Sequence, residues 1–127
     1  MADVVSFSVP GHPPSVNSYV RHARGRHYRT KAADRWLWDV SFAAKKQSVR
    51  GDAYEVNAVI WLGAKERIDI DNAGKLLLDS LVTAGVIDTD AKVVDLYLRK
   101  RRDAANPRTD ITVVVAQFES RCPCVPS

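Results

Sequence analysis

The sequence predicts one α+β domain, with a mixed β-sheet on which two helices pack. Segments whose apolar residues fall at every second position alternate with two segments of helical periodicity. Their order is strand, helix, strand, helix, strand, strand, which is typical of helices packed on one sheet. With 127 residues, 46% of them hydrophobic, the chain can form one core. We expect the domain to cover residues 1–120 and residues 121–127 to be a disordered tail.

The first half of the chain contains two predicted strands and one predicted helix. Residues 4–9 alternate between apolar and polar side chains, and a long polar loop follows as far as Thr30. Helical periodicity covers residues 31–48, and Thr30 is a suitable N-cap. Alternation returns over residues 54–62 and predicts the second strand. The residues expected on the buried face of the helix are Ala33, Trp36, Leu37, Val40, Phe42 and Ala44.

The second half contains one predicted helix followed by two strands. The helix covers residues 72–84, with Asp71 as its cap and Gly85 as its end. Residues 93–101 and 110–118 are predicted strands, joined by a loop that contains Asn-Pro. The sequence contains no internal repeat and no domain linker.

Charge is distributed unevenly along the chain. The formal net charge is +4, but residues 68–95 carry a net −4 and the remaining chain therefore +8. Bases gather in residues 21–35 and in residues 99–102. Basic surface suggests a polyanionic partner, and the acidic segment suggests metal-dependent chemistry on that polyanion. A solvated surface whose charges happen to cluster is the alternative.

The sequence also predicts the cellular location of the protein and the redox state of its two cysteines. No apolar run approaches the ~18 residues that span a bilayer, and an acid near the N-terminus is unlike a signal peptide. We therefore expect a cytoplasmic protein with no membrane partner. Cys122 and Cys124 are too few for a zinc site and too close for an ordinary disulfide, so we expect them to be reduced.

Aspartates surround the second predicted helix. Asp69 and Asp71 are two residues apart, so in an extended segment both carboxylates would lie on the same side. Lys75 follows Asp71 by one helical turn, and Asp88 and Asp90 follow the helix end. These aspartates and Lys75 form the candidate functional site of the sequence.

Grouped carboxylates suit a hard divalent cation. Mg²⁺ takes oxygen ligands and is usually held by one or two carboxylates together with substrate phosphates. A neighbouring lysine can contact the scissile phosphate or stabilise developing charge. However, twelve aspartates give about one Asp-x-Asp pair by chance, and the chain has two. The residues alone leave open a metal-dependent nuclease and a non-catalytic nucleic-acid binder.

Two segments carry a more specific signal. Residues 69–79 read Asp-Ile-Asp-Asn-Ala-Gly-Lys-Leu-Leu-Leu-Asp, and the helix then ends in Ala-Gly before a short acidic loop. Residues 13–17 read Pro-Pro-Ser-Val-Asn and lead into a basic loop. Both segments, in this order, resemble the RusA family of Holliday junction resolvases, whose patterns are Asp-x-Asp-Asn-x-x-Lys-x-x-x-Asp and Pro-Pro-Ser-x-Asn. The resemblance extends to about Arg101.

The resemblance implies a homodimeric endodeoxyribonuclease that cuts four-way DNA junctions by paired symmetric nicks. It implies Mg²⁺ as the cofactor, with Mn²⁺ able to substitute, and no small-molecule cofactor. Two alternatives stay open: a catalytically inactive basic DNA-binding accessory protein, and a nuclease that prefers forks or flaps.

The resemblance also implies the metal ligands. They are Asp69, Asp71 and Asp90, which would act with Lys75 as the catalytic residues. The acidic loop offers both Asp88 and Asp90, and the Val-Val-Asp sequence downstream favours the register of Asp90. Whether Asp88 joins the metal site stays open.

The remaining implied roles concern DNA. Lys75 would contact or stabilise the scissile phosphate, and Asp79 is expected to form an ion pair with it. Asn72 is expected to position DNA or a neighbouring carboxylate. The residues expected to bind DNA are Arg21, Arg24, Arg26, Arg29, Asn72, Lys75, Arg99 and Arg101.

Overall fold

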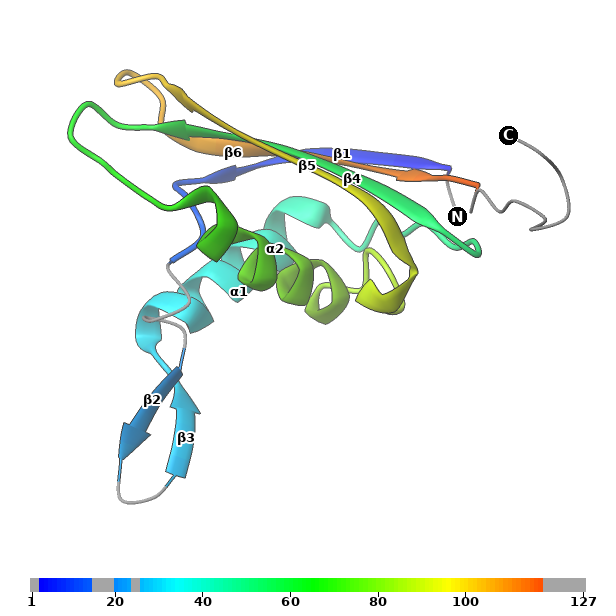
Figure 1. The fold of residues 1–127 in the computed structure, drawn as a ribbon, viewed down its shortest axis with the longest axis horizontal. Coiled ribbons are helices and arrows are strands. Elements are labelled where there is room, and N and C mark those ends of the chain that lie inside the picture. The colour runs from blue at the N-terminus through cyan, green and yellow to red at the C-terminus, as the bar shows by residue number, and fades with distance from the viewer. Residues whose placement is uncertain (1–2, 15–19, 24–25, 118–127) are drawn as a thin grey trace, which may run out of the picture.

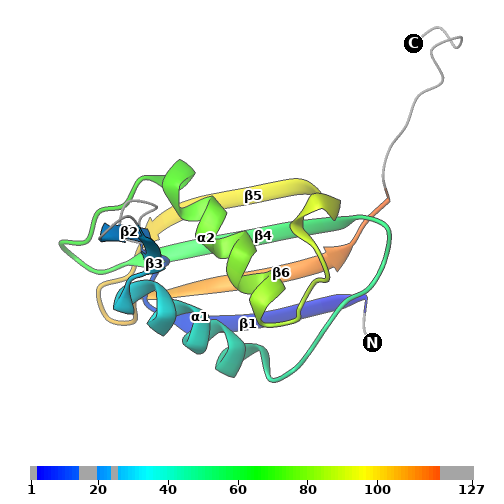
Figure 2. The same cartoon turned by 90° about the horizontal axis from the view of Figure 1, so that it is seen from below.

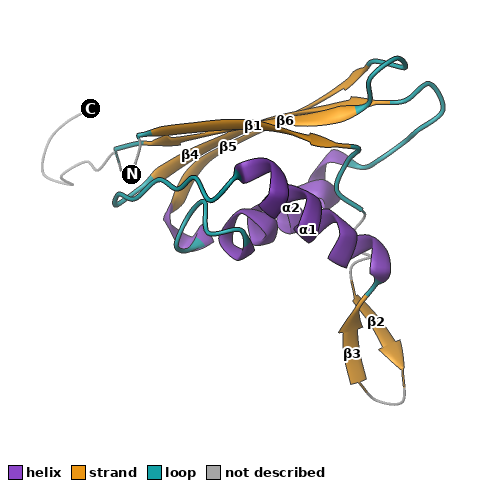
Figure 3. Ribbon diagram, turned by 180° about the vertical axis from the view of Figure 1, so that it is seen from behind, coloured by secondary structure: helices purple, strands orange, loops and turns teal. Residues whose placement is uncertain are grey.

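Two helices cover one face of a four-stranded sheet in the computed structural model, which describes residues 3–14, 20–23 and 26–117. Figures 1 and 3 show both helices on the same side of the sheet and a separate two-stranded hairpin. The predicted single-domain α+β class is confirmed. The elements are β1 (Val4–Pro10), β2 (Val20–Ala23), β3 (Arg26–Arg29), α1 (Lys31–Ala44), β4 (Tyr54–Leu62), α2 (Ile70–Thr83), the 3₁₀ helix η2 (Asp90–Lys92), β5 (Val93–Arg102) and β6 (Arg108–Val115).

The sheet is mixed and has the strand order β1-β6-β4-β5. β6 pairs antiparallel with both β1 and β4, whereas β4 and β5 run parallel. A parallel pair needs a crossover connection, and α2 supplies it. β1 and β5 are therefore the two edges of the sheet.

The core lies between the sheet and the two helices. β4 is the central example, because its side chains alternate between buried and half-buried along all nine residues. This alternation is the one that predicted the strand, and its predicted bounds of 54–62 are confirmed. The buried residues of α2 are Ala73, Gly74, Leu76, Leu77, Ser80 and Leu81.

Helix α1 begins as predicted and ends early. The Thr30 side chain accepts a hydrogen bond from the backbone N–H of Ala33 at 3.3 Å, which confirms the N-cap. The helix ends at Ala44 rather than at residue 48, because Lys45 adopts a left-handed conformation with φ 52°. A left-handed residue breaks the helical hydrogen-bond pattern.

The outward face of α1 carries two large apolar side chains. Trp38 is 72% exposed and Phe42 is 77% exposed. The prediction that Phe42 broadens the buried face is wrong, because it lies one turn after the outward-facing Trp38. Trp36 is buried, as predicted.

The polar segment before Thr30 is not wholly a loop. Its residues form an antiparallel hairpin in which Val20 pairs with Arg29 and Ala23 with Arg26. Figure 1 shows β2 and β3 projecting away from the sheet, beside the start of α1. Arg24, the segment around Asn17, the two cysteines and the predicted tail lie outside the described residues. Among the described helices, none combines the length and apolarity needed to cross a membrane.

Candidate active site at the start of helix α2

Helix α2 starts two residues earlier than predicted. Its N-cap is Asp69, whose backbone is extended (φ −90°, ψ 124°), and Asp71 lies in the first turn. The prediction of Asp71 as the cap is therefore wrong. Asp69 and Asp71 do not lie in the single extended segment expected from the sequence. Both nevertheless lie at the N-terminus of α2, because the chain turns into the helix between them. That end of a helix favours negative charge.

Asn72 connects the two carboxylates. Its side-chain Nδ2 donates to Asp69 Oδ2 at 3.4 Å, and its backbone N–H donates to Asp71 Oδ1 at 3.0 Å. Both aspartates are exposed. In the described part of the chain, neither forms an ion pair with a base. Two solvent-accessible carboxylates without a basic partner suit a hydrated divalent cation.

Lys75 follows Asp71 by one turn of α2. Its Nζ lies 3.7 Å from Asp79 Oδ2, which confirms the predicted ion pair. The lysine side chain is 71% exposed, whereas that of Asp79 is 27% exposed. Asp79 therefore holds the Lys75 side chain through the ion pair, and the ammonium group of Lys75 stays accessible to an anion.

Asp90 lies at the opposite end of the helix. The fourteen residues of α2 span about 21 Å, and Asp90 comes after the helix end, immediately before β5. At the far end of β5, Lys100 Nζ donates to the carbonyl of Ile68 at 2.9 Å, next to Asp69. Figure 2 shows η2 and the start of α2 at opposite ends of the sheet. Within one chain, the structure thus separates Asp90 from Asp69 and Asp71.

The side chains that could ligate a metal ion show the same separation. The described residues contain no group of three His, Cys, Asp or Glu side chains placed to hold a metal ion. One chain therefore supplies two of the three predicted metal ligands at the start of α2, together with Lys75 and Asn72.

Asp88 has a different environment from Asp90. Its carboxylate accepts hydrogen bonds from Lys92 Nζ at 2.8 Å and from the Tyr54 hydroxyl at 2.7 Å. These two bonds, the one from Lys92 first, hold the pKa of the Asp88 carboxyl well below its usual range. Lys92 also donates to the carbonyl of Gly51 at 3.1 Å. Asp88 therefore anchors η2 to the start of β4, while Asp90 is exposed.

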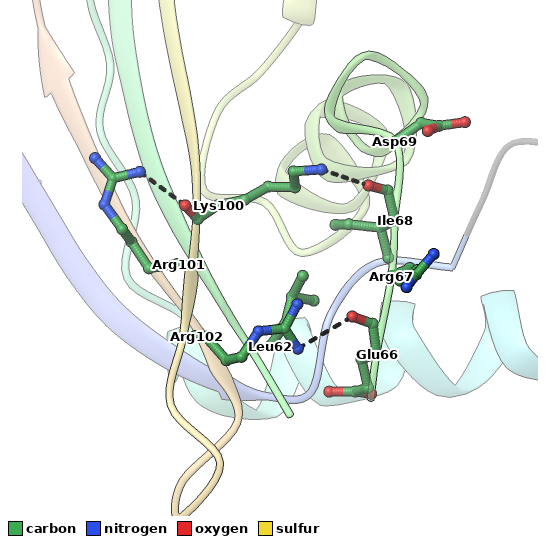
Figure 4. Close-up of a pocket in the computed structure, with 8 residues that line it drawn as sticks. All are labelled: Leu62, Glu66, Arg67, Ile68, Asp69, Lys100, Arg101 and Arg102. Carbon is green, nitrogen blue, oxygen red and sulfur yellow. Dashed lines mark hydrogen bonds between the residues drawn. The ribbon is translucent and has the colours of Figure 1, made fainter. Parts of the chain in front are cut away.

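A basic pocket of about 440 Å³ lies beside Asp69. Four basic residues line the pocket, and two of them donate hydrogen bonds to backbone carbonyls of the loop before α2. Lys100 donates to Ile68, as described above, and Arg102 Nη1 donates to the carbonyl oxygens of Gly63 and Glu66. Figure 4 shows Lys100 and Arg101 leaving β5 in opposite directions. The pocket residues are Leu62, Glu66, Arg67, Ile68, Asp69, Lys100, Arg101 and Arg102.

The predicted DNA-binding residues fall into two places. Arg99 and Arg101 are exposed on β5, and strand alternation puts them on the opposite face from Lys100 and Arg102. Arg21, Arg26 and Arg29 belong to the β2–β3 hairpin.

Some residues of this region were not singled out by the sequence. Lys100 and Arg102 were part of a basic run, and the two-residue period of a strand could have separated them from Arg99 and Arg101. No sequence signal indicated that Tyr54 and Lys92 would meet at Asp88, because their contact depends on the crossover between β4 and β5.

Comparisons with known proteins identify the family to which the chain belongs. The family model described as endodeoxyribonuclease RusA matches residues 10–114. The crossover junction endodeoxyribonuclease RusA of Escherichia coli K12 is 32% identical over 104 residues, which cover 80% of this chain and 87% of the relative. The rusA crossover junction endodeoxyribonuclease of Enterobacteria phage 82 gives the same identity and coverage. The chain belongs to the RusA endodeoxyribonuclease family.

Proposed function

We propose that this protein is a Mg²⁺-dependent endodeoxyribonuclease that resolves four-way DNA junctions by paired symmetric nicks. Its family membership supports the activity, since its relatives are named crossover junction endodeoxyribonucleases. One structural observation carries the chemistry. Asp69 and Asp71 are accessible and joined through Asn72, Lys75 is one turn away, and a basic pocket adjoins them.

The donor chemistry of this site fits the proposed cation. Asp69 and Asp71 would hold Mg²⁺ with carboxylate oxygens, and Asp90 is the proposed third ligand. When bound, the ion would lower the pKa of an attacking water and neutralise charge that builds on the phosphate.

The side chains of the chain itself position the phosphodiester. Asn72 orients Asp69 through its side-chain amide and Asp71 through its backbone N–H. Lys75 would bind a non-bridging oxygen of the scissile phosphate and stabilise the charge that grows there. Hydrolysis adds a water oxygen to phosphorus and breaks one phosphorus–oxygen bond, and the departing oxygen takes up a proton.

The basic residues would bind the phosphates on either side of the cut. Arg67 and Lys100 line the pocket beside Asp69, and Arg99 and Arg101 occupy the other face of the same strand. Contacts of this kind give affinity with little sequence information. A four-way junction has two equivalent scissile strands, so a two-fold dimer would match its symmetry.

The decisive assay is nicking of a synthetic immobile four-way junction, with duplex and fork DNA of the same sequence as controls. We expect symmetric cuts on the junction in Mg²⁺ and none in EDTA. Cuts that favour the fork would retain the nuclease and change the substrate. Binding without any cut, in Mg²⁺ or in Mn²⁺, would leave the alternative of an inactive DNA-binding protein.

Asp71→Asn tests the site directly. We expect it to abolish cleavage and to retain junction binding, because a metal-binding charge is lost from an exposed position. Removing one of two neighbouring like charges should keep the unfolding temperature at or above that of the wild type. Asp3→Asn is the matched control, since Asp3 is an exposed acid at the start of the chain. Loss of binding together with cleavage, or a lower unfolding temperature, would contradict this role for Asp71.

A further inference from the structure

The loop between β4 and α2 leads the chain to Asp69 and belongs to no helix or strand. It runs from Gly63 to Asp69. Within this loop, the described structure has one backbone hydrogen bond, from the N–H of Glu66 to the carbonyl of Gly63 at 3.2 Å. A segment with so few backbone bonds opens readily unless other contacts hold it. The position of Asp69 therefore depends on the side chains that contact the loop.

The Glu66 side chain closes the turn at the beginning of the loop. Its Oε1 accepts a hydrogen bond from the backbone N–H of Gly63 at 2.6 Å, so the two residues are bonded in both directions. A hydrogen bond to a charged acceptor is stronger than one between neutral groups. A Cβ atom at Gly63 would lie 2.9 Å from this oxygen, which is too close for the carboxylate to stay in place. The absence of a side chain at Gly63 thus allows the contact.

The other carboxylate oxygen of Glu66 reaches a different part of the chain. Oε2 lies 3.2 Å from Nε2 of His12, shortly after the end of β1. The backbone beside His12 is fixed to β6, because the Thr109 side chain donates to the carbonyl of Gly11 at 2.8 Å. Gly11 also donates its N–H to the carbonyl of Pro107 at 3.3 Å. His12 therefore gives the loop an anchor on the sheet.

The loop is also held from β5, but through different backbone groups. Lys100 and Arg102 both donate to backbone carbonyls of the loop. Figure 4 shows the two side chains extending from the strand to the loop that ends in Asp69. In the part of the chain that the structure describes, Glu66 is the one side chain that accepts a hydrogen bond from a backbone N–H of this loop. The bases of β5 cannot replace it in this role, since they only donate.

We propose that Glu66 is a positioning residue of the candidate active site, which holds Gly63 and His12 together and so fixes the loop that carries Asp69. This inference rests on the proposed function, in which Asp69 is a metal ligand. Glu66 acts through the backbone and contacts neither the ion nor the DNA. A ligand that is already held in place binds an ion more tightly, because less conformational entropy is lost on binding.

Amide hydrogen exchange of residues 63–69, without metal or DNA, tests whether Glu66 holds the loop. Glu66→Ala removes the charge and both contacts. Glu66→Gln removes the same charge but keeps an oxygen for the N–H of Gly63 and an amide that can bond the His12 ring. We expect about tenfold faster exchange in Glu66→Ala and exchange near that of the wild type in Glu66→Gln. Unchanged exchange in Glu66→Ala, or equally fast exchange in both variants, would overturn the proposal.

Gly63→Ala tests the same contact from its other end. The added methyl group should displace the Glu66 carboxylate while leaving its charge in the protein. We expect the exchange of the loop to rise as it does in Glu66→Ala. Asp3→Ala is the control, since it removes an exposed acid at the start of the chain and should exchange like the wild type. Exchange as slow as that of the wild type in Gly63→Ala would contradict the contact.

Mn²⁺ binding, measured by isothermal titration calorimetry, tests the effect on the metal site. Removing a residue that orients a metal ligand typically weakens metal affinity by roughly 10–100-fold. Glu66 acts through the loop, so we expect Glu66→Ala to bind Mn²⁺ about tenfold more weakly and Glu66→Gln to bind like the wild type. Junction binding in EDTA should stay within about twofold, because the phosphate contacts are unchanged. A lower unfolding temperature with unchanged Mn²⁺ affinity would show a merely structural role and overturn the positioning role.

The double variant His12→Ala, Glu66→Ala tests whether the two residues act through their contact. If they do, it should bind Mn²⁺ no more weakly than Glu66→Ala alone. Effects that multiply would show that His12 acts separately, which would contradict the joint role.

The two proposals fail in distinguishable ways. If the wild type cleaves no DNA in Mg²⁺ or in Mn²⁺, the proposed function is wrong, and hydrogen exchange still decides whether Glu66 holds the loop. If the wild type cleaves junctions and Glu66→Ala cleaves them with the same rate and the same Mg²⁺ dependence, the positioning role is wrong and the proposed function stands.

Discussion

Removing the hydroxyl group of Tyr54 should loosen η2, the short helix that carries Asp90. The hydroxyl donates to Asp88 Oδ1 at 2.7 Å and accepts from the backbone N–H of Gly51 at 3.3 Å. Burial, together with the bond to Asp88, raises the pKa of Tyr54, so the group stays protonated as a donor at neutral pH. Tyr54→Phe keeps the buried ring and deletes only these two bonds.

The expected cost follows from the burial and the charge of the acceptor. Tyr54 is 0% exposed, but the Asp88 side chain is 38% exposed, so water replaces part of the lost hydrogen bond to Asp88. A hydrogen bond to a charged group contributes roughly 1.5–3 kcal/mol, and the longer bond from Gly51 contributes less. Asp88 keeps its bond from Lys92. We expect a loss of about 1 kcal/mol in the free energy of unfolding, or about 4 °C in Tm for a chain of this size.

Urea unfolding of the wild type, Tyr54→Phe and Tyr97→Phe measures this cost. Tyr97 is half-exposed and its hydroxyl has no hydrogen bond in the described structure, so its variant should stay within about 0.5 kcal/mol of the wild type. Tyr54→Phe should also reduce junction cleavage more than junction binding. An unchanged free energy of unfolding for Tyr54→Phe would refute the argument that this hydroxyl anchors η2.

Two further predictions concern DNA binding and acid stability. The double variant Arg24→Ala, Arg26→Ala should weaken junction binding. If each arginine contacts one phosphate, the variant should also reduce the slope of log K against log salt by about 2. An unchanged slope would exclude the phosphate contacts. The pKa values of Asp88 and Asp103 are lowered, chiefly by hydrogen bonds from Lys92 and Arg108 respectively. Their stabilisation is therefore complete above about pH 4 and is lost as the pH falls further. Asp88→Asn should flatten this acid dependence in urea titrations, and a slope equal to that of the wild type would contradict it.

The regular elements of the fold were predictable because their signals are local. β4 alternates between core-facing and outward-facing residues over its whole length, so its bounds followed from the sequence. The stripe formed by Leu76, Leu77 and Leu81 identified α2 in the same way. Gly85 was correctly predicted to end it, since its φ of 78° is the left-handed conformation that glycine adopts readily.

The errors arose where the local signal was weak or ambiguous. β2 and β3 have four residues each and are rich in arginine and histidine, so no apolar alternation marked them. Lys45 ends α1 in a left-handed conformation, and no glycine at this position predicts the end of the helix. Asp69 and Asp71 are both acceptable caps by residue type, and only the backbone conformation distinguished them.

The position of Asp90 illustrates a different limit, since nearness in sequence did not give nearness in space. Asp90 would meet Asp69 and Asp71 within one chain only if α2 left the sheet or if η2 moved along the whole length of α2. Leu76, Leu77 and Leu81 of α2 are at most 1% exposed, and freeing each such side chain costs about 2–5 kcal/mol. Three of them together would consume most of the 5–15 kcal/mol that stabilises an ordinary domain. Within one folded chain, the packing of α2 against the sheet therefore holds Asp90 apart from Asp69 and Asp71.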